Sequence, residues 1–139
     1  MDAYVLSLMA WIAGTTGLYN PKVAPVVHYI SEKEMSIMYC HKVEAKCMLG
    51  GLYIWGSNTV YVNKDQSHAG RQVVLVHELT HYMQARNHQY YSGTCESNMK
   101  RELDAYVVEK KYAQMYYPKI GHRVKVPPEI NLDLCHKKQ

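Results

Sequence analysis

The stretch VVLVHELTHYMQ, residues 73–84, limits what this chain can fold into more than any other segment. Its apolar residues recur at the spacing of a buried α-helix, and the same run contains His77, Glu78 and His81. Polar and charged side chains are costly to bury unless they have partners. The chain must therefore place this helix in its core and still provide polar partners for two imidazoles and a carboxylate.

Two histidines at this spacing can bind one metal ion. Positions i and i+4 of a helix lie on one face, so His77 and His81 can both offer an imidazole nitrogen to a tetrahedral zinc. Glu78 lies roughly 100° around the helix from His77, too far to be a third ligand but able to reach a water on the open position of the metal. H-E-x-x-H on a helix is typical of zinc metalloproteases. The alternative, two hydrogen-bonded core histidines, leaves Glu78 without a partner.

A catalytic zinc site takes a third protein ligand, which can be another histidine, a cysteine or a carboxylate from the next helix. Metzincins place a glycine and a third histidine shortly after the motif. Here YMQARNHQYYSG follows, in which His88 is not at the position of the third histidine and the glycine is missing from its position. The later segment KRELDAYVVEKKY offers Glu102, and the small Ala105 would let its helix pack closely on the first.

The remaining segments predict an α+β domain. Four stretches carry the apolar spacing or the capping signals of helices: 3–13, 31–39, 69–87 and 95–117. Residues 25–30 are expected to be extended, and GLYIWGSNTVYVNKD (51–65) predicts a β-hairpin because turn residues separate two runs of β-branched and aromatic residues. We expect one domain over 1–139, with its core at about 3–117 and a C-terminal tail, 118–139, that wraps around it.

Composition excludes several classes of protein. The chain is 47% hydrophobic and 20% charged, as in ordinary globular domains, and has no apolar run of the roughly 18 residues that a membrane span needs. The opening MDAYVLSLMAWIAGTTG lacks a basic start and a processing site, so it predicts a core helix and not a signal peptide. The net charge of +4 is scattered, which disfavours nucleic-acid binding.

Four cysteines, Cys40, Cys47, Cys95 and Cys135, permit three disulfide pairings. We favour Cys40–Cys47, which closes a short loop, together with Cys95–Cys135, which ties down the C-terminal tail. Paired cysteines would indicate an oxidising compartment, so a secreted or periplasmic location is expected in that case. The alternative is four reduced, buried thiols in a cytosolic protein.

HELTH followed on a later helix by ELDAY resembles the gluzincins, metallopeptidases in which two histidines and the glutamate of an E-x-x-A or E-x-x-S segment hold zinc. More closely, the chain resembles small single-domain bacterial metallopeptidase-like proteins with a VHE(L/M)xHxxQ helix and a cysteine followed by RExxAY. The resemblance implies a minimal zincin-like fold with Glu78 as catalytic base. It implies His77, His81 and Glu102 as Zn²⁺ ligands. The residues that carry it are His77, Glu78, His81, Gln84, Cys95, Arg101, Glu102, Ala105 and Tyr106.

Two roles in the site depart from the gluzincin pattern. Larger gluzincins often place an aspartate four residues after the ligand glutamate, where it orients a ligand histidine, but this chain has Tyr106 there. We expect Tyr106 to act in the catalytic site in its place, with Glu109 as a second candidate and core packing as the alternative for Tyr106. A residue that stabilises the oxyanion has no clear counterpart, and Tyr90, Tyr91 and His122 are the candidates.

The sequence therefore predicts a zinc metalloendopeptidase. Zinc would lower the pKa of its bound water, and Glu78 would accept the proton before the hydroxide attacks an amide carbonyl. A peptide or protein substrate is expected to add a strand to the sheet edge beside the metal helix, with TVYVNK (59–64) as that edge. The alternative is a non-catalytic, zinc-containing module that binds a partner protein.

Overall fold

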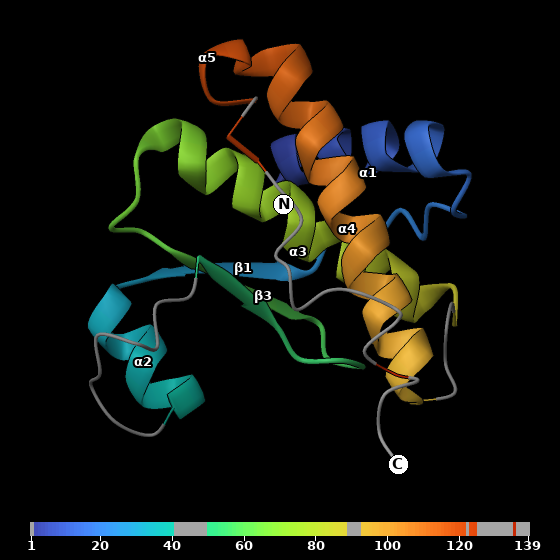
Figure 1. The fold of residues 1–139 in the computed structure, drawn as a ribbon, viewed down its shortest axis with the longest axis horizontal. Helices are drawn as coiled ribbons and strands as arrows, with labels where there is room; N and C mark the ends of the chain where they lie inside the picture. Colours follow the sequence, from blue (N-terminus) through green and yellow to red (C-terminus); the bar gives the residue numbers. More distant parts are fainter. Residues whose placement is uncertain (1, 41–49, 89–92, 122, 125–134, 136–139) are drawn as a thin grey trace.

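The computed structural model describes residues 2–40, 50–88, 93–121, 123–124 and 135. In these residues the fold is mixed α+β, with helices packed around a three-stranded sheet (Figure 1), which confirms the predicted class. The elements are α1 (Ala3–Thr16), β1 (Val26–Ile30), α2 (Glu32–Cys40), β2 (Gly51–Tyr53), β3 (Thr59–Asn63), α3 (His68–Arg86), α4 (Cys95–Tyr116) and α5 (Pro118–Gly121).

Side-chain caps stabilise the helix starts, and one of them, the capping box at α2, was predicted. At α2, the Ser31 hydroxyl accepts a hydrogen bond from the Glu34 N–H, and the Glu34 carboxylate accepts one from the Ser31 N–H, which confirms the capping box. Ser67 caps α3 and Thr94 caps α4 through their side-chain oxygens. Helix α1 runs past its predicted end at residue 13 because Gly17, in the left-handed conformation at φ 81°, ends it instead.

The sheet has the strand order β1-β3-β2. Strands β2 and β3 form the predicted antiparallel hairpin, with Tyr53 opposite Val60, and β1 pairs with β3 in parallel, with Val27 also opposite Val60. The prediction that 59–64 is the substrate-binding edge is therefore wrong, because β3 is hydrogen-bonded on both sides. A hairpin pattern cannot reveal that an earlier strand returns beside it, and the edge of this sheet on the hairpin side is β2.

Helix α3 packs against the sheet and against α1 and α4 (Figure 1). Val60 of β3 belongs to the same buried cluster as Met9 and Ile12 of α1. Because α3 is covered on most sides, almost every residue of the run 73–84 is buried, the polar ones included. Ala105 is fully buried in α4, in agreement with the expected close packing of α4 on α3.

The C-terminal part departs from the prediction at its start. Helix α4 ends at Tyr116, and Pro118 opens the short helix α5 in place of an irregular tail, since proline suits the first position of a helix. Residues 125–134 lie outside the described residues. None of the helices within the described ranges combines the length and the apolar character that crossing a membrane requires.

The disulfide predicted between Cys95 and Cys135 is confirmed, with Cα atoms 5.6 Å apart. It joins the first residue of α4 to the C-terminal segment. The Cys40–Cys47 pairing lies outside the described residues because Cys47 belongs to 41–49. The Cys95–Cys135 disulfide therefore holds the N-terminal end of α4, the helix that carries Glu102, covalently as well as by packing.

Candidate metal centre

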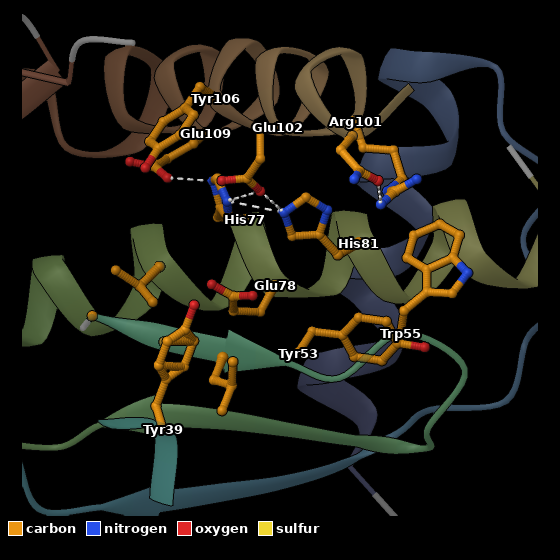
Figure 2. A pocket seen from close by; sticks show the side chains of 15 residues that line it. Tyr39, Tyr53, Trp55, His77, Glu78, His81, Arg101, Glu102, Tyr106 and Glu109 are labelled. Carbon is orange, nitrogen blue, oxygen red and sulfur yellow. Dashed lines mark hydrogen bonds and ion pairs between the residues drawn. The ribbon is translucent and has the colours of Figure 1, made fainter. Parts of the chain in front are cut away.

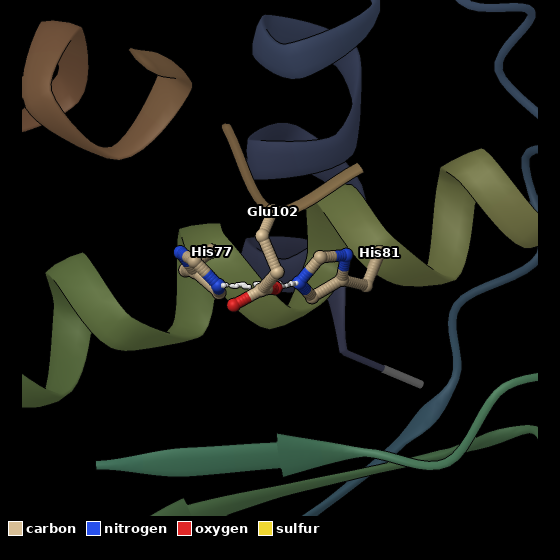
Figure 3. Close-up of side chains that lie close together, drawn as sticks. All are labelled: His77, His81 and Glu102. Carbon is tan, nitrogen blue, oxygen red and sulfur yellow. Dashed lines mark hydrogen bonds and ion pairs between the residues drawn. The ribbon is translucent and has the colours of Figure 1, made fainter. Parts of the chain in front are cut away.

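Three side chains from α3 and α4 converge on one point (Figure 3). Nε2 of His77 and Nε2 of His81 lie 3.2 Å apart, as expected for histidines one turn apart on a helix. Oε1 of Glu102, from α4, lies 3.3 Å from Nε2 of His77 and makes an ion-pair contact with Nε2 of His81. The three predicted ligand residues are thus brought together, with candidate ligand atoms within 4.8 Å of one another.

The spacing of these atoms fits a zinc ion. Ligand atoms bound to tetrahedral zinc at about 2.0–2.1 Å stand roughly 3.3–3.4 Å apart. The separations of His77 Nε2 from His81 Nε2, 3.2 Å, and from Glu102 Oε1, 3.3 Å, agree with this value. The third pair, His81 Nε2 and Glu102 Oε1, is in direct contact, so these two atoms would have to separate to admit the ion. Two imidazoles and one carboxylate are a ligand set of catalytic zinc sites, in which the fourth position is open.

Gln84 orients His81. Its side-chain oxygen lies 2.8 Å from Nδ1 of His81, and its side-chain nitrogen donates to the backbone carbonyl of Arg101 at 3.2 Å. With Nδ1 donating its proton to Gln84, Nε2 of His81 is the nitrogen that faces the ligand cluster. We did not predict this role, although a glutamine three residues after the second histidine lies on the same helical face and is a usable signal.

Glu109 and Tyr106 both contact His77. An oxygen of Glu109 lies 2.8 Å from Nδ1 of His77, but it approaches off the direction of the N–H, so this buried nitrogen makes no aligned hydrogen bond. The Tyr106 ring meets the imidazole edge to face, with centroids 4.5 Å apart. Of the two residues considered for orienting a ligand histidine, Glu109 is the one whose carboxylate reaches Nδ1, while Tyr106 packs against the ring.

Glu78 lies between the histidines and β2 (Figure 2), buried beneath Gly51. A Cβ atom at Gly51 would stand 2.8 Å from Cγ of Glu78 and 2.6 Å from a methyl carbon of Val74. The strand can approach α3 this closely only because the residue is glycine. Burial raises the pKa of the Glu78 carboxyl, and the positive charge of nearby histidines opposes part of that shift. Gly51 is a positioning residue that we did not predict.

A cleft of about 500 Å³ opens over these residues. Its walls come from β2, from α3 and α4, and from two aromatic residues at its ends, Tyr39 of α2 and Trp55 of the hairpin turn (Figure 2). These two lie far from the motif in the sequence, and nothing in the local pattern marks them as part of the site. The oxyanion candidates Tyr90, Tyr91 and His122 lie outside the described residues.

The carboxylates around His77 determine its proton affinity without metal. Burial lowers the pKa of His77, but Glu102 and Glu109 outweigh this effect and raise the pKa to about 10. Burial raises the pKa of the Glu102 carboxyl, but its contacts with His77 and His81 outweigh this effect and hold the pKa well below its usual range. In the metal-free protein at neutral pH, His77 is therefore an imidazolium ion between two carboxylates.

Zinc affinity is expected to rise roughly tenfold per pH unit between about pH 7 and pH 9. A metal ion binds the neutral imidazole, so the proton on His77 must leave, and its loss costs less as the pH approaches the pKa of about 10. Competition with a chromophoric chelator across this range measures the slope. A Gln84→Ala control should keep the slope and lower the affinity about 10- to 100-fold at every pH. A pH-independent wild-type affinity would contradict the assignment of His77.

The fold and the cluster define a small α+β protein with a candidate His-His-Glu metal centre in an open cleft. The chain belongs to the family described as Domain of unknown function (DUF6647), whose model matches residues 1–124. Comparison with curated proteins gives no significant match, and comparison with solved structures gives none either. The family carries no stated activity, so a function has to be argued from the site.

Proposed function

We propose that the protein is a zinc-dependent metalloendopeptidase with a gluzincin-type, zincin-like site. The observation that carries the proposal is the convergence of His77, His81 and Glu102 in a cleft that also contains the buried carboxyl of Glu78. Structural zinc sites are usually closed by four protein ligands, whereas catalytic sites keep one position open for water and substrate. Three ligands that face a cleft favour the catalytic arrangement.

When bound, zinc supplies Lewis acidity, which makes water nucleophilic near neutral pH and polarises a substrate carbonyl. Glu78 accepts a proton from the attacking water on its carboxylate and then donates it to the nitrogen of the leaving amine. Gln84 and Glu109 keep the two imidazoles in position.

Strand β2 supports a peptide as the substrate. It forms the hairpin-side edge of the sheet among the described residues, and Gly51, Leu52 and Tyr53 line the cleft. An extended peptide can pair with such an edge through main-chain hydrogen bonds, which recognise a backbone without regard to its side chains. We propose β2 for this role in place of residues 59–64.

Two observations favour catalysis over a zinc-containing interaction module without turnover. A purely structural site has no need for an open ligand position. It also has no use for a carboxyl such as Glu78, whose burial beside that position is costly. The Cys95–Cys135 disulfide supports a secreted or periplasmic location for such an enzyme, because disulfides persist in oxidising compartments.

Peptide cleavage that depends on zinc tests the proposal. The protein, prepared without chelator and loaded with one equivalent of zinc, is incubated with a mixture of random-sequence peptides, and the products are identified by mass spectrometry. We expect new peptide termini that disappear after chelation and return when zinc is added back. A fully zinc-loaded protein that cleaves no peptide in the mixture would overturn the proposal of a peptidase.

A further inference from the structure

We propose that Arg101 and Trp55 form a subsite that binds a carboxylate of the substrate, either an acidic side chain or the C-terminal carboxylate of a peptide. The inference rests on the proposed function, because it assigns a substrate class to the same cleft. It concerns the end of the cleft at the tip of the β2–β3 hairpin, beyond His81 (Figure 2).

Among the described residues, Trp55 and Asn98 position the guanidinium group of Arg101. Its central carbon lies 4.3 Å from the centroid of the Trp55 ring, within the range of a cation–π contact. The guanidinium also donates a hydrogen bond to the side-chain oxygen of Asn98, one turn earlier on α4. Trp55, in the hairpin turn, and Arg101, on α4, therefore join two elements that form opposite walls of the cleft.

This arrangement suits the recognition of a carboxylate. A guanidinium is planar and always charged, and its N–H groups form a fork that matches the two oxygens of a carboxylate. Stacking on Trp55 and the hydrogen bond to Asn98 restrict the plane of the Arg101 fork, so less conformational freedom is lost when an anion binds. The half-buried aromatic wall also reduces the screening of the charge by water.

The charges of the cleft are separated along its length. Its carboxylates, on Glu78, Glu102 and Glu109, gather around the two histidines. Among the described residues that line the cleft, the one lysine or arginine is Arg101, at the hairpin end. An anionic group on a peptide bound at the hairpin end of the cleft is therefore attracted to Arg101.

The path of β2 places this subsite within reach of a bound peptide. The strand passes Glu78 at Gly51 and runs toward Trp55. Four residues of extended chain span at most about 13 Å, so a peptide that lies along β2 with its scissile bond near Glu78 reaches Arg101 within roughly four residues. The carboxylate that Arg101 binds therefore belongs to a residue close to the cleaved bond.

Binding to the zinc-loaded Glu78→Gln protein tests the subsite without turnover. The probes are fluorescent peptides of one sequence that carry glutamate or glutamine at each position in turn, each with a free or an amidated C-terminus. We expect the best carboxylate-bearing peptide to bind at least about tenfold more tightly than its neutral counterpart. Tighter binding of amidated peptides that carry glutamate would show that a side chain supplies the bound carboxylate. Tighter binding of glutamine peptides with a free C-terminus would show that the terminal carboxylate is bound.

Variants assign this preference to Arg101. Arg101→Gln should abolish it, and Trp55→Leu should weaken it, while the affinity for neutral peptides and the zinc content stay unchanged. Arg101→Lys keeps the charge without the planar fork and should lose most of the preference. Lys110→Gln, an equal charge change at an exposed position of α4, is the matched control and should have no effect.

Equal affinity for carboxylate-bearing and neutral peptides would overturn the subsite, as would a preference that persists in Arg101→Gln. The subsite and the proposed function fail in distinguishable ways. If the wild type cleaves peptides without regard to carboxylates, the protein is a peptidase and the proposed subsite is wrong. If carboxylate-dependent binding needs Arg101 but no peptide is cleaved, the subsite exists and the proposed peptidase activity is wrong.

Discussion

Replacement of Glu78 by glutamine is expected to lower kcat for peptide cleavage by about 10²- to 10⁴-fold, the usual contribution of a general base. The amide has nearly the same size as the carboxyl, so it fits beneath Gly51, but it cannot accept a proton from water. Zinc content should not change, because Glu78 is not one of the three clustered ligand residues. Steady-state kinetics and plasma mass spectrometry on the same preparation measure both quantities.

The Glu78→Gln protein should fold at least as well as the wild type. Burial raises the pKa of this carboxyl because the site disfavours its charged form, and a neutral amide avoids that cost. Glu96→Gln, the same change in the exposed first turn of α4, is the matched control and should leave kcat unaltered. Full activity in Glu78→Gln would rule out Glu78 as the base, and a loss of zinc would mean that Glu78 acts as a ligand.

Replacement of His81 or Glu102 by alanine is expected to reduce bound zinc from one ion per chain to a small fraction of that. Loss of an outer partner of a metal ligand already costs about 10- to 100-fold in affinity, and loss of a ligand should cost more. Zinc at about 1,000 times its Kd should stabilise the wild-type fold by about 4 kcal/mol, because it binds the native state alone. Both variants should lose this zinc-dependent rise in Tm.

His28→Ala is the matched control for the ligand variants. His28 is exposed on β1, stacked on Tyr61, and away from the cluster of donors. Its replacement should leave both the zinc content and the zinc-dependent rise in Tm intact. If the wild type, prepared without chelator, neither contains nor takes up zinc, the three residues form an ion-pair network in the core and the metal centre does not exist.

Much of the scaffold could be predicted from local patterns. The capping box at Ser31 and Glu34, the hairpin around residues 56–58 and the long helices each depend on neighbours a few residues apart, and all are present. The features of the fold that were not predicted depend on contacts between segments that are distant in the sequence. The parallel pairing of β1 with β3 moved the sheet edge from residues 59–64 to β2, and no periodicity within either strand encodes that choice.

The candidate site likewise combines features set by local sequence with features set by tertiary contacts. The sequence by itself determined that His77 and His81 share a helical face, because their spacing is a property of any α-helix. It also marked Glu102 as the candidate third donor through its resemblance to the gluzincins. The sequence did not determine how these donors are oriented, since it favoured Tyr106, with Glu109 as the second candidate, and it is the Glu109 carboxylate that reaches Nδ1 of His77.

Only the tertiary structure decided what surrounds the donors. The packing of α4 on α3 brings Glu109 to His77 and the backbone of Arg101 to Gln84. The approach of β2 buries Glu78 and makes Gly51 necessary. The physical reason is the range of the interactions: helical spacing and capping act over a few residues of chain, whereas burial, hydrogen-bond partners and the walls of a cleft arise where segments distant in sequence meet in space.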